Sequence, residues 1–263
     1  MPVSVANAGN KPKASVDHLV GHRTAMRRVF MKRDVVWYDV GIRCVSSEER
    51  DFMAKDTELI FIVDKSGSML GLEDDTVGGI NATLDANRQG EGDVYVSVVF
   101  FDTNVETLLD HVLIGDVTAI VRDDYRPGGM TALLDAVGVT LDAAKERVMA
   151  QKKSKRPRVI VAIITGGAEN SSREYKYEDI KKRVDDLGKK DFEFLFLGAN
   201  IDAIGTASHL GISANRASAY VADADGTAVA YGAMAKATAS YRATGTVLNS
   251  WSDDVSADAA TRG

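Results

Sequence analysis

The sequence predicts an α/β fold: a doubly wound, Rossmann-like, mostly parallel sheet with one antiparallel edge strand and helices on both faces. Two observations predict it. Short runs rich in apolar residues occur at 59–63, 94–101, 158–165 and 192–197, which is typical of strands covered on both faces. Between these runs, longer segments carry apolar residues at spacings of three and four, the period of an amphipathic helix. Strands that alternate with helices in this way form a parallel sheet with helices on both faces.

From residue 57 onward the expected elements follow in order. Helices are expected at 75–88, 131–149, 177–187, 203–210 and 227–241, and a weak strand at 217–221. Residues 105–113 follow a tight turn and should form the antiparallel edge strand. The short connections favour one domain over 57–244. Residues 245–263 are small and polar around Trp251, and we expect a flexible C-terminal tail there.

Residues 1–56 form an N-terminal extension outside this pattern. Its apolar positions predict a short basic helix over 20–30, and the alternation of Val36 to Cys44 predicts a strand. Such a strand can pair at a sheet edge or with a neighbouring subunit, so the extension is a possible assembly arm. Residues 1–55 hold ten Lys/Arg and six Asp/Glu, a net charge of +4, which leaves −10 for the remainder. The basic residues form either a solvated helix face or a surface for an acidic partner or nucleic acid.

Composition excludes several function classes. The formal net charge of −6 makes nucleic acid an unlikely partner for the chain as a whole. Cys44 is the single cysteine, so an intrachain disulfide and a Cys-rich metal site are both excluded, and a cytoplasmic location is expected. No apolar run approaches the roughly 20 residues that a membrane span needs. The four histidines are scattered, and we find no phosphate-binding loop or nucleophile elbow. We therefore expect no enzymatic activity.

The first apolar strand ends in Asp64-Lys65-Ser66-Gly67-Ser68. In an open parallel sheet, binding sites lie at the carboxyl ends of the strands. Asp64 supplies a negative charge there. Ser66 and Ser68 lie two residues apart on a turn and can both offer hydroxyl oxygens to one hard cation. The alternative is that Asp64 and the serines cap the helix that follows.

Two further strand ends carry polar or glycine-rich segments, Asp102 and Thr165-Gly166-Gly167-Ala168-Glu169-Asn170, and Gly128-Gly129-Met130-Thr131 opens the helix expected at 131–149. With these segments, residues 57–244 resemble the von Willebrand factor A family. Members hold a divalent cation in a metal-ion-dependent adhesion site (MIDAS), built from D-x-S-x-S, a threonine in a G-G-T-like loop and an aspartate in T-D-G. Residues 169–175 are similar to the bacterial and phage intracellular branch of that family.

The resemblance implies a set of site residues. Ser66, Ser68 and Thr131 would be direct ligands of Mg²⁺ (or Mn²⁺ or Ca²⁺), and Asp64 would act through a bound water. An acidic side chain of a protein partner would take the open position. The usual second aspartate falls on Gly166. This leaves two alternatives: a cation site with less negative charge, which Asp102 or Glu169 would partly replace, or a metal-free face of the same shape.

The resulting function is a protein-binding or scaffold module, oligomeric or part of a larger bacterial or phage assembly. Two other classes stay open. One is a structural assembly protein with a vestigial metal site, whose terminal arms make the contacts. The other is a Mg²⁺-dependent hydrolase, for which the sequence offers neither a second firm carboxylate nor a nucleophile with an adjacent base.

Overall fold

The computed structural model describes residues 27–30, 35–38 and 55–262. The chain divides into two compact units, Met1–Asp51 and Phe52–Gly263. In the first unit, β1 (Arg27–Phe30) pairs with β2 (Val35–Tyr38) in antiparallel fashion. The predicted basic helix is therefore wrong over 27–30, because cross-strand pairing there overrides a weak helical pattern. The predicted strand over 36–44 is confirmed at 36–38, and its remaining residues lie outside the described part.

The second unit contains a six-stranded sheet in the order β5-β4-β3-β6-β7-β8. Its strands are β3 (Thr57–Asp64), β4 (Val94–Phe101), β5 (Val105–Leu113), β6 (Arg158–Thr165), β7 (Phe192–Gly198) and β8 (Ala217–Ala219). All neighbours pair in parallel except β4 and β5, which are antiparallel. The predicted fold class, with one antiparallel edge strand, is confirmed.

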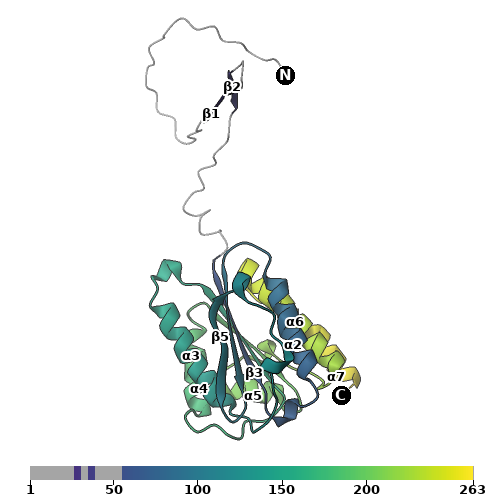
Figure 1. Ribbon diagram of the computed structural model, residues 1–263. Helices are drawn as coiled ribbons and strands as arrows, with labels where there is room; N and C mark the ends of the chain where they lie inside the picture. The colour runs from purple at the N-terminus through teal and green to yellow at the C-terminus, as the bar shows by residue number, and fades with distance from the viewer. Residues whose placement is uncertain (1–26, 31–34, 39–54, 263) are drawn as a thin grey trace, which may run out of the picture. The chain divides into compact units, whose positions relative to one another are not determined.

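Helices cover both faces of this sheet (Figure 1). One layer holds α2 (Glu73–Asn87), α6 (Ala224–Thr244) and α7 (Asp253–Arg262). The other holds α3 (Leu133–Met149), α4 (Tyr177–Leu187) and α5 (Ala203–His209). None of the described helices combines the length and the apolar character that crossing a membrane requires.

The central strands are apolar throughout because each of their faces meets a helical layer. In β3, Leu59, Phe61 and Val63 belong to the core beneath α2 and α6. The intervening residues Ile60 and Ile62 belong to the core beneath α3 and α4. Every residue of β3 is buried, including the polar Asp64 at its carboxyl end. The sheet therefore presents a carboxyl group at its carboxyl end with almost no exposure to solvent.

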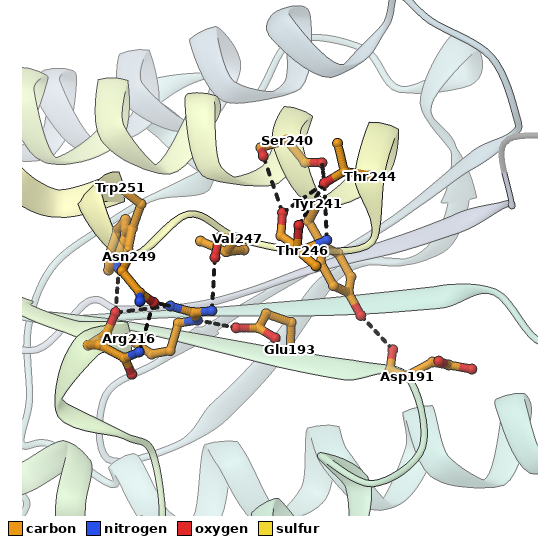
Figure 2. Close-up of polar contacts among 11 residues, drawn as sticks. Asp191, Glu193, Arg216, Ser240, Tyr241, Thr244, Thr246, Val247, Asn249 and Trp251 are labelled. Atoms are coloured by element: carbon orange, nitrogen blue, oxygen red, sulfur yellow. Dashed lines mark hydrogen bonds and ion pairs between the residues drawn. The ribbon is translucent and has the colours of Figure 1, made fainter.

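The C-terminal segment is ordered, contrary to the expected flexible tail. A short 3₁₀ helix (Asn249–Ser252) leads into α7, and Trp251 and Val255 are buried. The indole of Trp251 donates to the carbonyl of Asn215 at 3.0 Å. Figure 2 shows this segment lying along Arg216, whose guanidinium contacts Glu193, the Val247 carbonyl and the Asn249 side chain. Most of these contacts use backbone atoms and distant side chains, which leave no periodic signal in the sequence.

Candidate functional site

Asp64 is the last residue of β3, and its side chain is fully buried. Its Oδ1 accepts a hydrogen bond from the backbone N–H of Ser66 at 2.7 Å. Its Oδ2 accepts one from the hydroxyl of Thr165 at 2.7 Å and one from the backbone N–H of Gly166 at 3.1 Å. Donors from two neighbouring strand ends therefore hold this carboxylate, which anchors the turn over 64–68.

The hydroxyl oxygens of Ser66 and Ser68 lie 2.9 Å apart. Ser66 is buried, whereas Ser68 is exposed. Neither serine caps a helix: Ser66 precedes the short 3₁₀ helix Gly67–Met69 without a side-chain capping bond, and the N-cap of α2 is Leu72. The structure therefore gives no support to the capping alternative for the serines, and it leaves both hydroxyls at the carboxyl end of the sheet.

Two backbone hydrogen bonds join the serine turn to the glycine-rich loop before α3. The N–H of Gly67 donates to the carbonyl of Gly129 at 3.2 Å, and the N–H of Gly128 donates to the carbonyl of Lys65 at 2.8 Å. The two loops thus lie side by side, which brings Thr131 to the serines although the sequence separates them by more than sixty residues.

Thr131 is buried and is held by Asn170, which follows β6. The side-chain oxygen of Asn170 accepts from the N–H of Thr131 at 2.9 Å, and the N–H of Asn170 donates to the carbonyl of Thr131 at 3.0 Å. A β-carbon at Gly167 would lie 2.9 Å from the Ser68 hydroxyl oxygen and 3.1 Å from that of Thr131. The hydroxyls of Ser68 and Thr131 therefore both lie beside Gly167, which has no side chain to fill the space next to them.

Glu169, one of the two predicted helper carboxylates, is engaged elsewhere. Its oxygens accept hydrogen bonds from the backbone N–H groups of Leu134, Ser171 and Ser172, at 2.8 to 3.0 Å. Leu134 lies in the first turn of α3, where a negative charge is favourable. The Glu169 carboxylate thus stabilises the start of α3 and its own turn.

Asp102, the other predicted helper, caps the turn between β4 and β5. Its Oδ1 accepts from the N–H of Asn104 at 2.7 Å, and its carbonyl accepts from the N–H of Ala132 at 2.8 Å. The first bond shapes the β4–β5 turn, and the second fastens that turn beside Thr131. Asp102 therefore lies at the border of the site, where its role is to support the loop that carries Thr131.

Gly166 stands where the resemblance implies a second aspartate, and the structure shows what takes up the space. A β-carbon there would lie 2.4 Å from the sulfur of Met69 and 3.4 Å from the hydroxyl oxygen of Ser68. Gly166 has no positive φ, so its backbone would accept another residue. The obstacle is the fully buried Met69 side chain. The Met69 side chain therefore fills the space that a side chain at residue 166 would occupy.

The spacing of the two serine hydroxyls is compatible with a small divalent cation as well as with the hydrogen bond between them. Ligand oxygens at neighbouring positions around Mg²⁺, each at 2.0–2.1 Å from the ion, lie about 2.9 Å from one another, and Ser66 and Ser68 show that spacing. The described residues contain no group of three or more His, Cys, Asp or Glu side chains placed to hold a metal. A cation at this face would therefore depend on three hydroxyls and on Asp64 alone for charge.

Sequence reasoning missed two residues that shape the site. Tyr125, which is buried, donates from its hydroxyl to the main-chain carbonyl of Asp64 and packs edge-to-face on Phe100. Met69 occupies the space beside Gly166. Both contacts join residues far apart in the chain or depend on side-chain shape, and no motif or periodicity marks them.

No protein-family model matches the chain, and no curated protein matches its sequence. Among solved structures, proximal thread matrix protein 1 from the mussel byssus is similar, with a TM-score of 0.53 and 17% identity over 71% of this chain and 47% of that one. The same mussel protein, described with a zinc-occupied MIDAS motif, gives 0.51 and 15% over 71% and 46%. A von Willebrand factor type A structure from Catenulispora acidiphila gives 0.47 and 15% over 71% and 43%.

The chain spans a little under half the length of these structures. At such identities the likeness defines the fold. The six-stranded sheet with its two helical layers is a von Willebrand factor A-type fold, as the strand-end motifs of the sequence imply.

Proposed function

We propose that this domain binds another protein through a docking face made of Ser66, Ser68, Leu70, Met130 and Thr131, with a divalent cation joining the hydroxyls to an acidic side chain of the partner. The observation that carries this proposal is that three hydroxyls lie in adjacent loops beside exposed apolar residues. Ser66 and Ser68 bond to each other, and Ser68 and Thr131 approach the same point. A ligand at this face would therefore contact more than one hydroxyl.

The apolar residues of the docking face favour a protein as the ligand. Leu70 is 64% exposed and Met130 is 51% exposed, and each is within two residues of a site hydroxyl. Exposed apolar side chains gathered beside a polar centre are typical of protein-binding surfaces. We infer that the partner offers an acidic residue flanked by an apolar one.

The metal would be held by the hydroxyls of Ser66, Ser68 and Thr131, with Asp64 supplying charge from beneath. The cation would supply electrostatic attraction for a carboxylate. Zinc occupies the MIDAS motif of the mussel protein that shares this fold, and we extend divalent-cation binding to this chain as part of the proposal. Mg²⁺ or Mn²⁺ suits hydroxyl and carboxylate oxygens better than zinc does.

We infer binding and not catalysis. A nucleophile or general base must reach the reacting atoms. Asp64 is the carboxylate at the centre of the site, yet it is fully buried and accepts three hydrogen bonds from the protein. Its geometry suits an anchor for the turn better than a group that exchanges protons with a substrate.

The cellular setting is part of the same proposal. The single cysteine, Cys44, supports a reducing, cytoplasmic compartment. The likeness of residues 169–175 to the bacterial and phage branch supports a scaffold role in a larger assembly, with the N-terminal extension as an assembly arm.

Selection from a displayed library of random peptides tests the docking face without a known partner. In Mg²⁺, the wild-type chain should enrich peptides that carry an acidic residue next to an apolar one, and chelator should abolish the enrichment. Ser66→Ala/Ser68→Ala should lose these peptides. Leu70→Ser should enrich these peptides less strongly than the wild type. Leu248→Ser, which changes an equally exposed leucine elsewhere, should enrich them as strongly as the wild type. Enrichment that survives in the double serine variant would overturn the proposal.

A further inference from the structure

The first half of β7 lies at an open edge of the sheet. The short strand β8 pairs only with residues 196–198 of β7. No other described strand accompanies residues 192–195 on that side, whereas β6 pairs with β7 from Phe192 onward on the other side. An unpaired strand edge presents main-chain N–H and C=O groups to which another strand can bond.

The main-chain groups of Phe192 and Phe194 point to this open edge. The carbonyl of Asp191 accepts a hydrogen bond from β6, and that of Gly198 accepts one from Tyr220, which follows β8. Because main-chain groups alternate in direction along a strand, the even-numbered residues of β7 face away from β6. Within the described part of the chain, neither Phe192 nor Phe194 has a main-chain hydrogen bond on that side.

A groove of about 250 Å³ lies at the same edge. Its lining includes Val184, Phe192, Phe194, Ile212, Ser213 and Arg216. The four apolar residues of this set belong to one buried cluster, in the layer that holds α4 and α5. Small-molecule sites typically have volumes of roughly 300–1,000 Å³. The smaller groove therefore favours a ligand that extends along β7 over a compact one.

The two faces of the sheet differ at this edge. On one face, Val184 and Ile212 border the groove and are almost fully buried. On the other face, Glu193 and Arg216 form an ion pair beside the C-terminal segment (Figure 2). A strand added to β7 places alternate side chains on these two faces. The edge therefore suits a segment in which apolar and polar residues alternate.

The N-terminal extension contains such a segment at residues 36–44. Its alternating apolar residues are Val36, Tyr38, Val40, Ile42 and Cys44, and the residues between them include Asp39, Gly41 and Arg43. Among the described strands, β2 at the start of this segment pairs with β1 alone, which leaves its other edge available. The extension has a net charge of +4, whereas the groove lining holds two carboxylates, Asp185 and Glu193, and one guanidinium.

We propose that residues 36–44 of one copy of the chain add as a strand to the open edge of β7 in a second copy. The apolar side chains of the added strand lie over Val184 and Ile212, and its main chain bonds to Phe192 and Phe194. Residues 45–56 join this strand to β3 and can span up to roughly 40 Å when extended, enough to reach a neighbouring copy. The inference rests on the assembly role proposed for the extension and not on the cation site.

The opposite edge of the sheet, at β5, is less suited to strand addition. Register shifts interrupt the pairing of β4 with β5 between Val96 and Val99, and His111 on β5 has a positive φ. Such irregularities bend an edge strand and hinder the addition of another strand.

Light scattering on the full chain in chelator, at increasing protein concentration, tests the proposal. The wild type should associate, whereas Val40→Ser/Ile42→Ser and Ser213→Trp should each keep the mass of the monomer. Ser213 is exposed, so the tryptophan fills the groove at little cost to folding, which an unchanged urea midpoint verifies. Two controls should associate as the wild type does. Asp39→Ser/Arg43→Ser changes only the polar face of the strand, and Ser208→Trp alters an exposed serine outside the groove lining.

Mixing the two monomeric variants gives the second readout. The strand of Ser213→Trp and the groove of Val40→Ser/Ile42→Ser are both intact, so the mixture should form heterodimers. A monomeric wild type, or variants that associate as the wild type does, would overturn the proposal. So would a mixture without heterodimers, because a strand that pairs within its own chain cannot complement a second copy. Association that requires Mg²⁺ would assign the contact to the cation site instead and would also overturn it.

Discussion

The hydroxyl of Thr165, at the end of β6, donates a 2.7 Å hydrogen bond to Oδ2 of Asp64, at the end of the neighbouring strand β3. Both residues are fully buried. The bond orients a charged group that solvent does not reach, and the same carboxylate holds the N–H of Ser66. Thr165 therefore positions Asp64 and, through it, the serine turn of the proposed docking face.

Replacing Thr165 by valine keeps the shape of the side chain and removes this donor. We expect the free energy of unfolding to fall by about 1–3 kcal/mol, because the buried carboxylate loses one of its three hydrogen bonds. Urea unfolding at neutral pH measures the loss. Thr165→Ser retains the hydroxyl, so its free energy of unfolding should fall clearly less than that of Thr165→Val. Equal stability of Thr165→Val and the wild type would contradict the assigned role.

The two serines should matter little for folding. The only hydrogen bond of their hydroxyls among the described residues is the one between them, and removing both partners of a bond is nearly neutral. Ser66→Ala/Ser68→Ala should change the unfolding free energy by less than about 0.5 kcal/mol in chelator. Ser68→Ala alone should be more destabilising than the double variant, since it leaves the buried Ser66 hydroxyl unpaired. Unfolding of the double variant would assign the serines a structural role.

Adjacent glycines in α2 should respond in opposite directions. A β-carbon at Gly79 would collide with the Tyr231 ring, whereas one at Gly78 would meet nothing within 4 Å. Gly79→Ala should destabilise the domain by about 1–3 kcal/mol through overpacking. Gly78→Ala should stabilise it by about 0.5–1 kcal/mol, because alanine suits a helix better than glycine. Thermal unfolding of both variants is the measurement, and equal effects would refute the close α2–α6 contact.

Restoring the aspartate at Gly166 should require a second change. Gly166→Asp alone should destabilise the domain, because its β-carbon meets the Met69 sulfur at 2.4 Å. Met69→Val removes that sulfur and retains a carbon near the Cγ position, 3.5 Å away. The combined variant should regain part of the lost stability and bind Mn²⁺ more tightly than the wild type, since it adds a carboxylate near the ion. Additive stability effects in this double-mutant cycle would show that the two positions are not coupled.

Local patterns predicted most of the second unit. The apolar runs of β3 and β6 and the three-four spacing of α3 reflect burial against neighbouring layers, and burial leaves a periodic trace in the sequence. The segment that contains α7 escaped prediction because Trp251 and Val255 are its main apolar anchors, too few to form a stripe. The strand β1 (Arg27–Phe30) escaped because strand pairing is weakly encoded in short segments.

The candidate site was likewise predictable only in part. The positions of Asp64, Ser66, Ser68 and Thr131 at the carboxyl end of the sheet were predictable, because each residue follows or precedes a recognisable element there. The Met69 side chain against Gly166 was not predictable, because side-chain packing across a turn has no sequence period. The role of Glu169 at the start of α3 was also missed, since a capping carboxylate and a metal-site carboxylate have the same residue type.

Isothermal titration with Mn²⁺ after chelator treatment tests the central claim, that the hydroxyls of Ser66, Ser68 and Thr131 form a cation-dependent docking face. We expect one Mn²⁺ bound per wild-type chain and at least a roughly tenfold weaker affinity in Ser66→Ala/Ser68→Ala, with Leu248→Ser as the unchanged control. Absence of binding to the wild type, or equal affinity in the double serine variant, would contradict it.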